Sequence, residues 1–286
     1  MKPGSVLKAV PTIEGAGVHL KRVFGYHHQP LFDPFLLLDD FHGSDPVTYR
    51  KGFPWHPHRG IETITLLLHG SVDHGDSLGS NGVINAGDVQ WMTAGSGIVH
   101  QEMPRGDSTG LMRGLQLWAN LPAAQKMTDP KYRDVTAGDI PVVSGLGYSM
   151  RVVAGTFNGV SGPVDDIVID PELFVGTLDP GGRVTHRTAP GYTFFIYLLA
   201  GTLVLGADQV IDHEHLVLLP GGEEITLIAG DHGADFLMVS GKPLKEPVAW
   251  GGPIVMNTRE ELRRAFHEYE QGTFLNHTGS GSPPKG

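Results

Sequence analysis

Short apolar runs recur along the chain, separated by glycine, proline, aspartate and asparagine. Most runs are four to eight residues long and rich in β-branched or aromatic side chains, which strands prefer. Representative runs cover residues 61–68, 89–92, 115–119, 194–199, 216–219 and 236–239. This pattern predicts an all-β protein built from many short strands.

One helix is expected near the C-terminus. Thr258 and Glu261 have the spacing of a capping box at the start of residues 260–271, and Gly272 is a stop signal. The tail that follows, residues 277–286, is rich in glycine, serine and proline, so we expect it to be disordered.

The chain also contains an internal repeat. Residues 60–72 and 191–203 both read as a glycine, a mostly apolar run, a second glycine and a small hydroxyl residue, at an offset of 131. Residues 89–95 match residues 216–222 at an offset of 127. The repeat therefore predicts two copies of one antiparallel β-unit, and a double-sheet jelly roll fits units of this length. We expect the domains to span 1–140 and 141–276.

Composition narrows the chemistry that these units can perform. The 286 residues include no cysteine, which excludes disulfides, a thiolate nucleophile and a cysteine-based metal site. The net charge is −10 and no basic run is present, so direct nucleic-acid binding is not expected. Neither an apolar leader nor an apolar run of about 18 residues occurs. We expect a cytoplasmic protein that does not bind membranes, or a nuclear one if the source is eukaryotic.

Candidate metal ligands gather in two short motifs, FPWHPHRGIE and GIVHQE. The five candidates are His56, His58, Glu62, His100 and Glu102. Side chains alternate along a strand, so an extended first motif would point its three candidates the same way, and the two in the second motif also share a face. Three neutral imidazoles with one carboxylate suit Fe, Mn, Ni, Cu or Zn. Alternation alone leaves both glutamates open as the fourth ligand.

The second copy of the repeat is expected to lack this site. The repeat places Arg187 and Ala189 opposite the two histidines of the first motif. It places Leu227 and Ala229 opposite the histidine and glutamate of the second motif. Every ligand position is therefore lost, and we expect an apolar interior there.

The two motifs resemble the cupin signature, and longer stretches resemble the pirin family of two-cupin proteins. These stretches are DPFLLLDDF, HPHRGIETIT and AGSGIVHQEMP, and the resemblance covers nearly the whole chain. It implies two cupin barrels packed face to face, with one divalent transition metal in the N-terminal barrel. It also implies that His56, His58, His100 and Glu102 are the ligands, while Glu62 lies beside the metal.

The resemblance implies functions from two classes. Bacterial pirin-like proteins are known as quercetinases, which open the flavonol ring with O2 and release carbon monoxide. Fe(II) is then the expected metal, with Mn, Ni, Co, Cu or Zn as alternatives, and Glu102 or Glu62 would act as the base. Pirin itself is associated with transcription factors, which implies a non-enzymatic, iron-binding regulatory or redox-sensing protein that acts through protein partners. Another cupin dioxygenase or an isomerase fits the resemblance less well.

Apolar and aromatic side chains near the motifs predict a pocket for a planar aromatic substrate such as a flavonol. The candidates are Phe53, Trp55, Trp91, Met92, Val99, Met103, Gln116 and Trp118. Arginine and lysine are sparse near the motifs, which disfavours a sugar phosphate. Two fused barrels already bury the face through which single cupins dimerise, so we expect a monomer.

Overall fold

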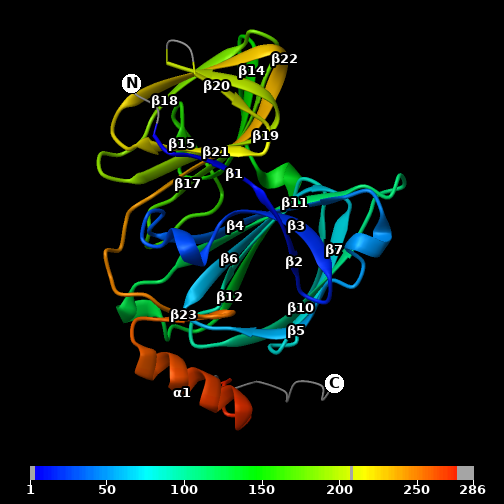
Figure 1. Ribbon diagram of the computed structural model, residues 1–286, viewed down its shortest axis with the longest axis vertical. Coiled ribbons are helices and arrows are strands. Elements are labelled where there is room, and N and C mark those ends of the chain that lie inside the picture. Colours follow the sequence, from blue (N-terminus) through cyan, green and yellow to red (C-terminus); the bar gives the residue numbers. More distant parts are fainter. Residues whose placement is uncertain (1–3, 207–208, 276–286) are drawn as a thin grey trace. The chain divides into compact units, whose positions relative to one another are not determined.

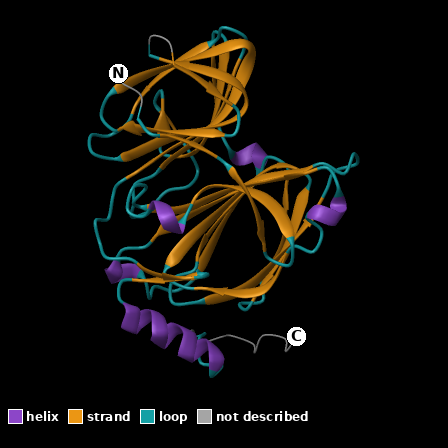
Figure 2. Ribbon diagram, viewed as in Figure 1, coloured by secondary structure: helices purple, strands orange, loops and turns teal. Residues whose placement is uncertain are grey.

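The computed structural model describes residues 4–206 and 209–275 (Figure 1). Strands and loops form most of this part of the chain (Figure 2), and its one α-helix is α1 (Arg259–Glu270). The expected capping box is confirmed, because the Thr258 hydroxyl accepts from the backbone N–H of Glu261 and the Glu261 carboxylate accepts from that of Thr258. No helix in the described ranges is long and apolar enough to cross a membrane. The predicted disorder of residues 277–286 concerns residues outside the described ranges.

The chain divides into two compact units. The first unit comprises Pro11–Gln29, Phe35–Ala137 and the segment from Lys245 onward. The second unit comprises the chain up to Val10, Pro30–Pro34 and Gly138–Leu244. The N-terminal segment up to Val10 thus belongs to the same unit as Gly138–Leu244. The segment from Lys245 belongs to the same unit as Phe35–Ala137. The predicted boundary at residue 140 separates the two repeats but does not anticipate this exchange, which depends on long-range pairing.

The first unit contains two antiparallel sheets that form a barrel. One sheet has the strand order β5-β10-β7-β8, and the other has the order β12-β9-β6-β11-β4-β3-β2. The strands are β2 (Val10–Glu14), β3 (Val18–Phe24), β4 (Phe35–Gly43), β5 (Phe53–His58), β6 (Ile61–His69), β7 (Ser71–Asp76), β8 (Asn81–Asn85), β9 (Val89–Thr93), β10 (Ile98–Arg105), β11 (Met112–Asn120) and β12 (Lys131–Val135). A hairpin of β23 (Ala249–Gly251) and β24 (Ile254–Met256) precedes α1. Single 3₁₀ turns lie at Tyr26–His28, Pro46–Thr48 and Ala123–Gln125.

The second unit is built around one antiparallel sheet. The main path is β1-β21-β19-β22-β17-β14-β13, with β18 paired to β22 and β20 to β19. The strands are β1 (Val6–Lys8), β13 (Val142–Gly145), β14 (Tyr148–Ala154), β15 (Thr156–Phe157), β16 (Val160–Ser161), β17 (Glu172–Leu178), β18 (Arg183–Arg187), β19 (Thr193–Leu205), β20 (Gln209–Asp212), β21 (His215–Pro220) and β22 (Glu224–Gly241). A 3₁₀ turn, Ala137–Asp139, links the units in sequence. The expected all-β fold with two similar β-units and one short helix is confirmed.

Strand register bears out the repeat. In the first unit Glu62 pairs with Thr93, and in the second unit Thr193 pairs with Pro220. These two pairs are related by the offsets of 131 and 127 that the sequence predicts. The two copies therefore share strand pairing as well as strand order.

The same register corrects the alignment of the ligand strand. Ile98 pairs with His58, while its counterpart Ile225 pairs with His186. His58 therefore corresponds to His186, and the predicted match to Ala189 is wrong. The second copy has three more residues in the loop after this strand, which an ungapped comparison misses.

The other histidine of the first motif is corrected in the same way. His56 pairs with His100, and Val184 pairs with Leu227. His56 therefore corresponds to Val184, and the predicted match to Arg187 is wrong.

Candidate metal centre

Strand β5 presents two histidines to one side of the first barrel. It is an edge strand, which is where prolines are tolerated in a sheet, and Pro54 and Pro57 lie in it. Side chains alternate along an extended strand, so His56 and His58 share a face. His56 pairs directly with His100 on β10, which brings the third imidazole to the same place.

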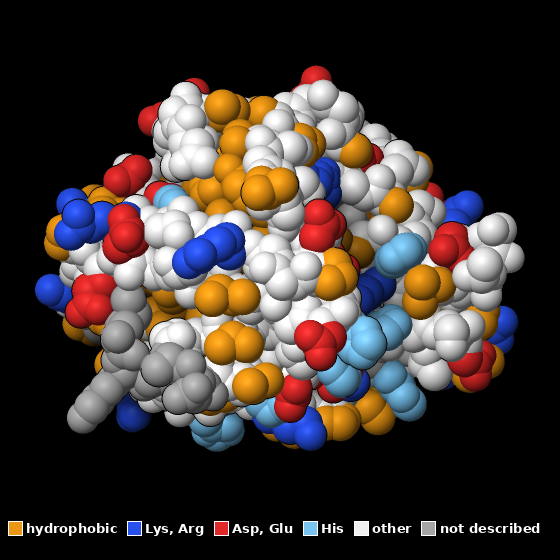
Figure 3. All heavy atoms as spheres, turned by 90° about the horizontal axis from the view of Figure 1, so that it is seen from above, with side chains coloured by type: hydrophobic (Ala, Val, Ile, Leu, Met, Phe, Trp, Pro, Cys, Tyr) orange, Lys and Arg blue, Asp and Glu red, His pale blue; other side chains and the backbone are white. Residues whose placement is uncertain are grey.

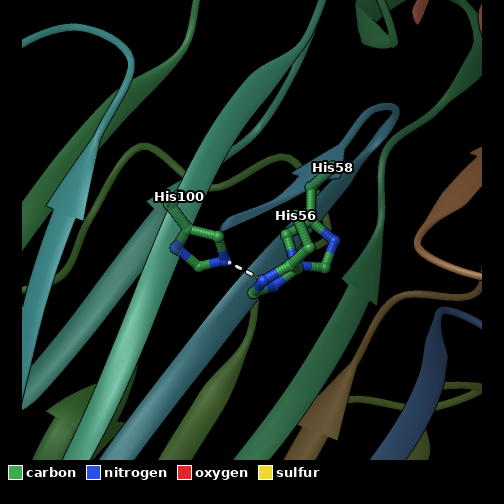
Figure 4. Close-up of side chains that lie close together, drawn as sticks. All are labelled: His56, His58 and His100. Carbon is green, nitrogen blue, oxygen red and sulfur yellow. Dashed lines mark hydrogen bonds between the residues drawn. The ribbon is translucent and has the colours of Figure 1, made fainter. Parts of the chain in front are cut away.

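The three imidazoles point toward one another (Figure 4). The Nε2 atom of His56 lies 3.0 Å from Nε2 of His58 and 3.0 Å from Nε2 of His100. Two nitrogens about 2.1 Å from one ion and about 90° apart would be separated by about 3.0 Å. The cluster therefore fits a single metal ion.

Backbone carbonyls orient two of these rings. The Nδ1 atom of His56 lies 2.8 Å from the carbonyl oxygen of Pro54, and Nδ1 of His58 lies 3.1 Å from that of Pro253. Each Nδ1–H donates to its carbonyl, which leaves the Nε2 lone pair directed at the centre of the cluster.

Burial keeps the three rings neutral. It lowers the pKa of His56, and it lowers the pKa values of His58 and His100 well below the ordinary value. Neighbouring imidazoles lower the latter two further. Neutral imidazoles are the form that binds a metal.

Glu102 lies at the edge of this cluster. Its Oε2 is 3.9 Å from Nε2 of His100, and its Oε1 is 3.4 Å from the hydroxyl of Thr65. The Thr65 hydroxyl also lies 3.0 Å from the side-chain oxygen of Gln116, so its one proton has two acceptors. Burial raises the pKa of Glu102 to about 7, against a smaller lowering by Thr65. A bound cation would favour the ionised carboxylate.

Glu62 is not brought to the histidines. Its Oε1 accepts a hydrogen bond of 2.6 Å from Thr93 and lies 3.9 Å from Nη1 of Arg133. The strand alternation ends at His58, because Gly60 has a φ of +77° and turns the chain before β6 begins. Burial raises the pKa of Glu62, against the Thr93 hydrogen bond.

A cavity of about 710 Å³ opens onto the cluster, and all of its lining residues belong to the first unit. Of the predicted pocket residues, it is lined by Phe53, Trp55, Gln116 and Trp118. The other four predicted residues, Trp91, Met92, Val99 and Met103, do not line it. Trp91, Met92 and Val99 are instead buried in the core.

Several lining residues were missed because they come from strands β3 and β4 and from the C-terminal segment. They include Leu20, Arg22, Leu37, Asp39, Phe41, Trp250 and Pro253. The aspartates in the apolar run FLLLDDF were the one available signal, since buried carboxylates are uncommon without a partner.

An ion-paired group forms a polar wall of the cavity. Arg22 donates to both carboxylate oxygens of Asp39 at 2.9 and 2.8 Å, and its Nη1 lies 2.9 Å from Glu14. Burial raises the pKa of Asp39 to about 6, although Arg22 opposes this shift. The cavity thus combines aromatic walls, a polar wall and the histidine cluster.

The C-terminal segment anchors the ligand strand. Arg59, next to His58, is 2% exposed and donates to Ser96 O at 2.7 Å, to the Glu268 carboxylate at 2.6 Å and to Phe274 O at 2.7 Å. Its guanidinium also lies 4.1 Å from the centre of the Phe274 ring. Helix α1 and the residues after it therefore hold the strand that carries two of the histidines.

One face of the molecule is mixed in charge. On the face shown in Figure 3, basic side chains are scattered among acidic ones and are not gathered in one patch.

Fold and site together define a protein with two cupin domains and, in the first, a histidine cluster suited to a metal ion. The chain belongs to the pirin family. Residues 17–119 match the family model described as Pirin, and residues 173–275 match that described as the Pirin C-terminal cupin domain.

Relatives with different names resemble the chain to a similar degree. A protein of Pseudomonas aeruginosa named "Putative quercetin 2,3-dioxygenase" is 40% identical over 92% of this chain and 94% of its own length. Human pirin is 39% identical over 90% of this chain and 88% of its own. The solved structure of quercetin 2,3-dioxygenase from Acinetobacter baumannii aligns with a TM-score of 0.88 and 34% identity, over 96% of this chain and 98% of that one.

Proposed function

We propose that the chain is a metal-dependent dioxygenase that opens the central ring of a flavonol such as quercetin. In this reaction both atoms of O2 enter the ring-opened product, and the carbon that carried the 3-hydroxyl leaves as carbon monoxide. One observation carries the proposal: His56 and His58, two of the three converging imidazoles, line a 710 Å³ cavity with aromatic walls. That volume lies within the range of about 300–1,000 Å³ typical of small-molecule sites.

We assign His56, His58, His100 and Glu102 as ligands of one divalent metal, with Fe(II) as the native ion. Four protein ligands on a five- or six-coordinate ion leave positions for substrate, which a catalytic site needs. When bound, the ion would supply Lewis acidity and an electron path between substrate and O2.

The side chains around the cluster have separate roles in this proposal. Trp55 and Trp118 stack on the flavonol rings and exclude water from them. Arg22 and Asp39 hydrogen-bond to hydroxyls at the far end of the flavonol. Glu102 would take the proton of the 3-hydroxyl as general base.

Aerobic turnover tests the proposal directly. Metal-free protein is reconstituted separately with Fe(II), Mn(II), Ni(II), Co(II) and Cu(II), and each form is incubated with quercetin in air. We expect loss of flavonol absorbance with release of one carbon monoxide per quercetin in at least the Fe(II) form. Metal-free protein is the matched blank, because quercetin also oxidises slowly by itself. The absence of carbon monoxide above that blank in all five forms would refute the enzyme proposal.

A regulatory role is the second candidate. In it the metal would bias a protein-binding surface in place of turning over a substrate. Tyr26 favours it, because this cavity-lining side chain is 61% exposed and packs edge-on against Trp250, with ring centres 5.6 Å apart. Exposed aromatic side chains are common at protein interfaces. Metal binding without turnover would support this candidate.

A further inference from the structure

One ring of the histidine cluster lacks the support that the other two have. The Nδ1 atoms of His56 and His58 lie within hydrogen-bond distance of backbone carbonyls, whereas Nδ1 of His100 is fully buried and has no hydrogen-bond partner. A metal-binding histidine almost always donates its second N–H to a carboxylate, a carbonyl or a water. The partner of His100 must therefore be sought among its neighbours.

Asp76 is the nearest candidate by strand register. It lies directly opposite His100 in the antiparallel pair of β7 and β10, so both side chains project from the same face with Cβ atoms about 5 Å apart. One of its oxygens, Oδ1, accepts from the backbone N–H groups of Leu78 and Ser80 at 2.8 and 2.9 Å. The other, Oδ2, is buried and accepts from no backbone N–H group.

Two further buried side chains, Tyr132 and His74, lie near this carboxylate. After burial itself, the charge of Asp76 and a hydrogen bond to Asp76 are the largest causes that raise the pKa of Tyr132, which places its hydroxyl beside the carboxylate. The ring of Tyr132 stacks on that of His74, 6.0 Å between centres. His74 accepts from Gln90 at Nε2, 3.1 Å away, so its Nδ1 carries the proton and, like that of His100, has no hydrogen-bond partner.

These four atoms have complementary hydrogen-bonding roles. His100 and His74 offer N–H donors, Asp76 offers an acceptor, and the hydroxyl of Tyr132 can do either. Two buried N–H donors near a buried carboxylate and a hydroxyl are the usual setting of an ordered internal water, which needs two to four polar partners. A small cavity of about 170 Å³ is lined by His74, Gln90 and Tyr132, so water can come close to two of the four groups.

We propose that Asp76 is a positioning residue for His100, which it reaches through an ordered buried water that Tyr132 and His74 help to hold. The carboxylate fixes the tautomer with the proton on Nδ1, directs Nε2 at the metal and raises the basicity of the ring. This inference rests on the proposed metal centre, and it assigns a role to residues outside the proposed ligand set.

Cobalt binding tests the inference without relying on turnover. The dissociation constant for Co(II) and the visible spectrum of the Co(II) form are measured for wild type, Asp76→Asn and Tyr132→Phe, together with the thermal midpoint of each metal-free protein. The asparagine retains an oxygen for Leu78 and Ser80 but loses the charge. We expect Asp76→Asn to weaken Co(II) binding about 10- to 100-fold and to shift the ligand-field bands. Tyr132→Phe should weaken it about threefold to tenfold.

Asp73→Asn is the matched control. Asp73 lies on the same strand, opposite Met103, and pairs with Arg105. Its Co(II) affinity and spectrum should match those of wild type. Asp76→Asn behaving like this control would overturn the inference. If Asp76→Asn lowers the thermal midpoint of the metal-free protein by more than a few degrees, Tyr132→Phe becomes the test variant. Wild-type Co(II) affinity and an unchanged spectrum in Tyr132→Phe would then overturn the inference. Failure of wild type to bind Co(II) would instead refute the metal centre itself.

Discussion

The two units share strand pairing but differ at the positions that form the histidine cluster. By strand register, His56 and His100 correspond to Val184 and Leu227, and the offset of 127 places Ala229 at the position of Glu102. All three second-unit residues belong to one buried apolar cluster. The fourth position keeps a histidine, His186. The expectation of an apolar interior in the second copy is therefore met at three of the four ligand positions.

The remaining histidine shows what a polar interior needs. His186 lies 3.2 Å from the Glu172 carboxylate, which also accepts from Ser240 at 2.7 Å. These groups satisfy one another, so they need no ion. In the first unit, three neutral imidazoles converge with nitrogens 3.0 Å apart, an arrangement that a shared cation would stabilise and that hydrogen bonding alone satisfies poorly.

The largest expected effect is complete loss of the metal from the first unit. His56→Ala combined with Glu102→Ala removes two of the four assigned ligands, so metal per chain and quercetin turnover should both fall to background. The matched double variant in the second unit, His186→Ala with Glu172→Ala, should retain one metal per chain. Metal analysis after gel filtration checks both. Full metal content in the first variant would contradict the ligand assignment.

The next effect concerns stability. Arg59→Met removes a buried guanidinium that pairs with the partly exposed Glu268 and donates to the buried carbonyls of Ser96 and Phe274, which should destabilise the first unit by about 3–5 kcal/mol. All four tryptophans, at positions 55, 91, 118 and 250, lie in this unit, so urea unfolding followed by tryptophan fluorescence reports on it. Arg187→Met, at an exposed site in the second unit, should lower the free energy of unfolding by no more than about 1 kcal/mol, measured by urea unfolding followed by circular dichroism. Equal losses in the two variants would contradict the expected difference between the units.

We expect Asp39 to make a pH-dependent contribution of roughly 3 kcal/mol to the free energy of unfolding. Its folded pKa of about 6 exceeds the ordinary 3.8, so its stabilising contribution is fully present below pH 3.8 and is lost as the pH rises through 6. The free energy of unfolding of wild type, relative to Asp39→Asn, should therefore be higher at pH 4 than at pH 7.5. Urea titrations at the two pH values measure it, and a difference that does not change with pH would contradict the burial argument.

The smallest effect separates the two glutamates. Glu102→Gln should weaken metal binding roughly a hundredfold, about 2.7 kcal/mol, because a ligand charge is lost. Glu62→Gln should change the affinity by no more than about twofold, since Glu62 contacts Thr93 and Arg133. Competition with a chromophoric chelator gives both constants. A larger loss of metal affinity in Glu62→Gln than in Glu102→Gln would indicate that Glu62 is the ligand.

Local patterns predicted the β-class, the repeat and the capped helix, because each depends on residues close in sequence. The convergence of His56, His58 and His100 was also predictable, since it follows from alternation on two strands. The position of Glu62 was not, because the turn at Gly60 interrupts that alternation. The choice between the two glutamates came from the family resemblance alone.

The pocket walls were harder to predict because they come from distant segments. Arg22 and Asp39 reach the cavity through the pairing of β3 with β4, and Trp250 reaches it from the C-terminal hairpin. Trp91 is an aromatic side chain near the motifs and is therefore among the predicted pocket residues, but it is fully buried in the structure. Neither fact can be read from local periodicity, which gives the face of a strand but not what lies opposite it.

The decisive experiment on the metal centre is a crystal structure of the Fe-loaded protein with anomalous difference density at the iron edge. We expect one peak per chain, bonded to Nε2 of His56, His58 and His100 and to a carboxylate oxygen of Glu102, and no peak in the second unit. A peak bonded to Glu62, or one beside His186 and Glu172, would contradict it.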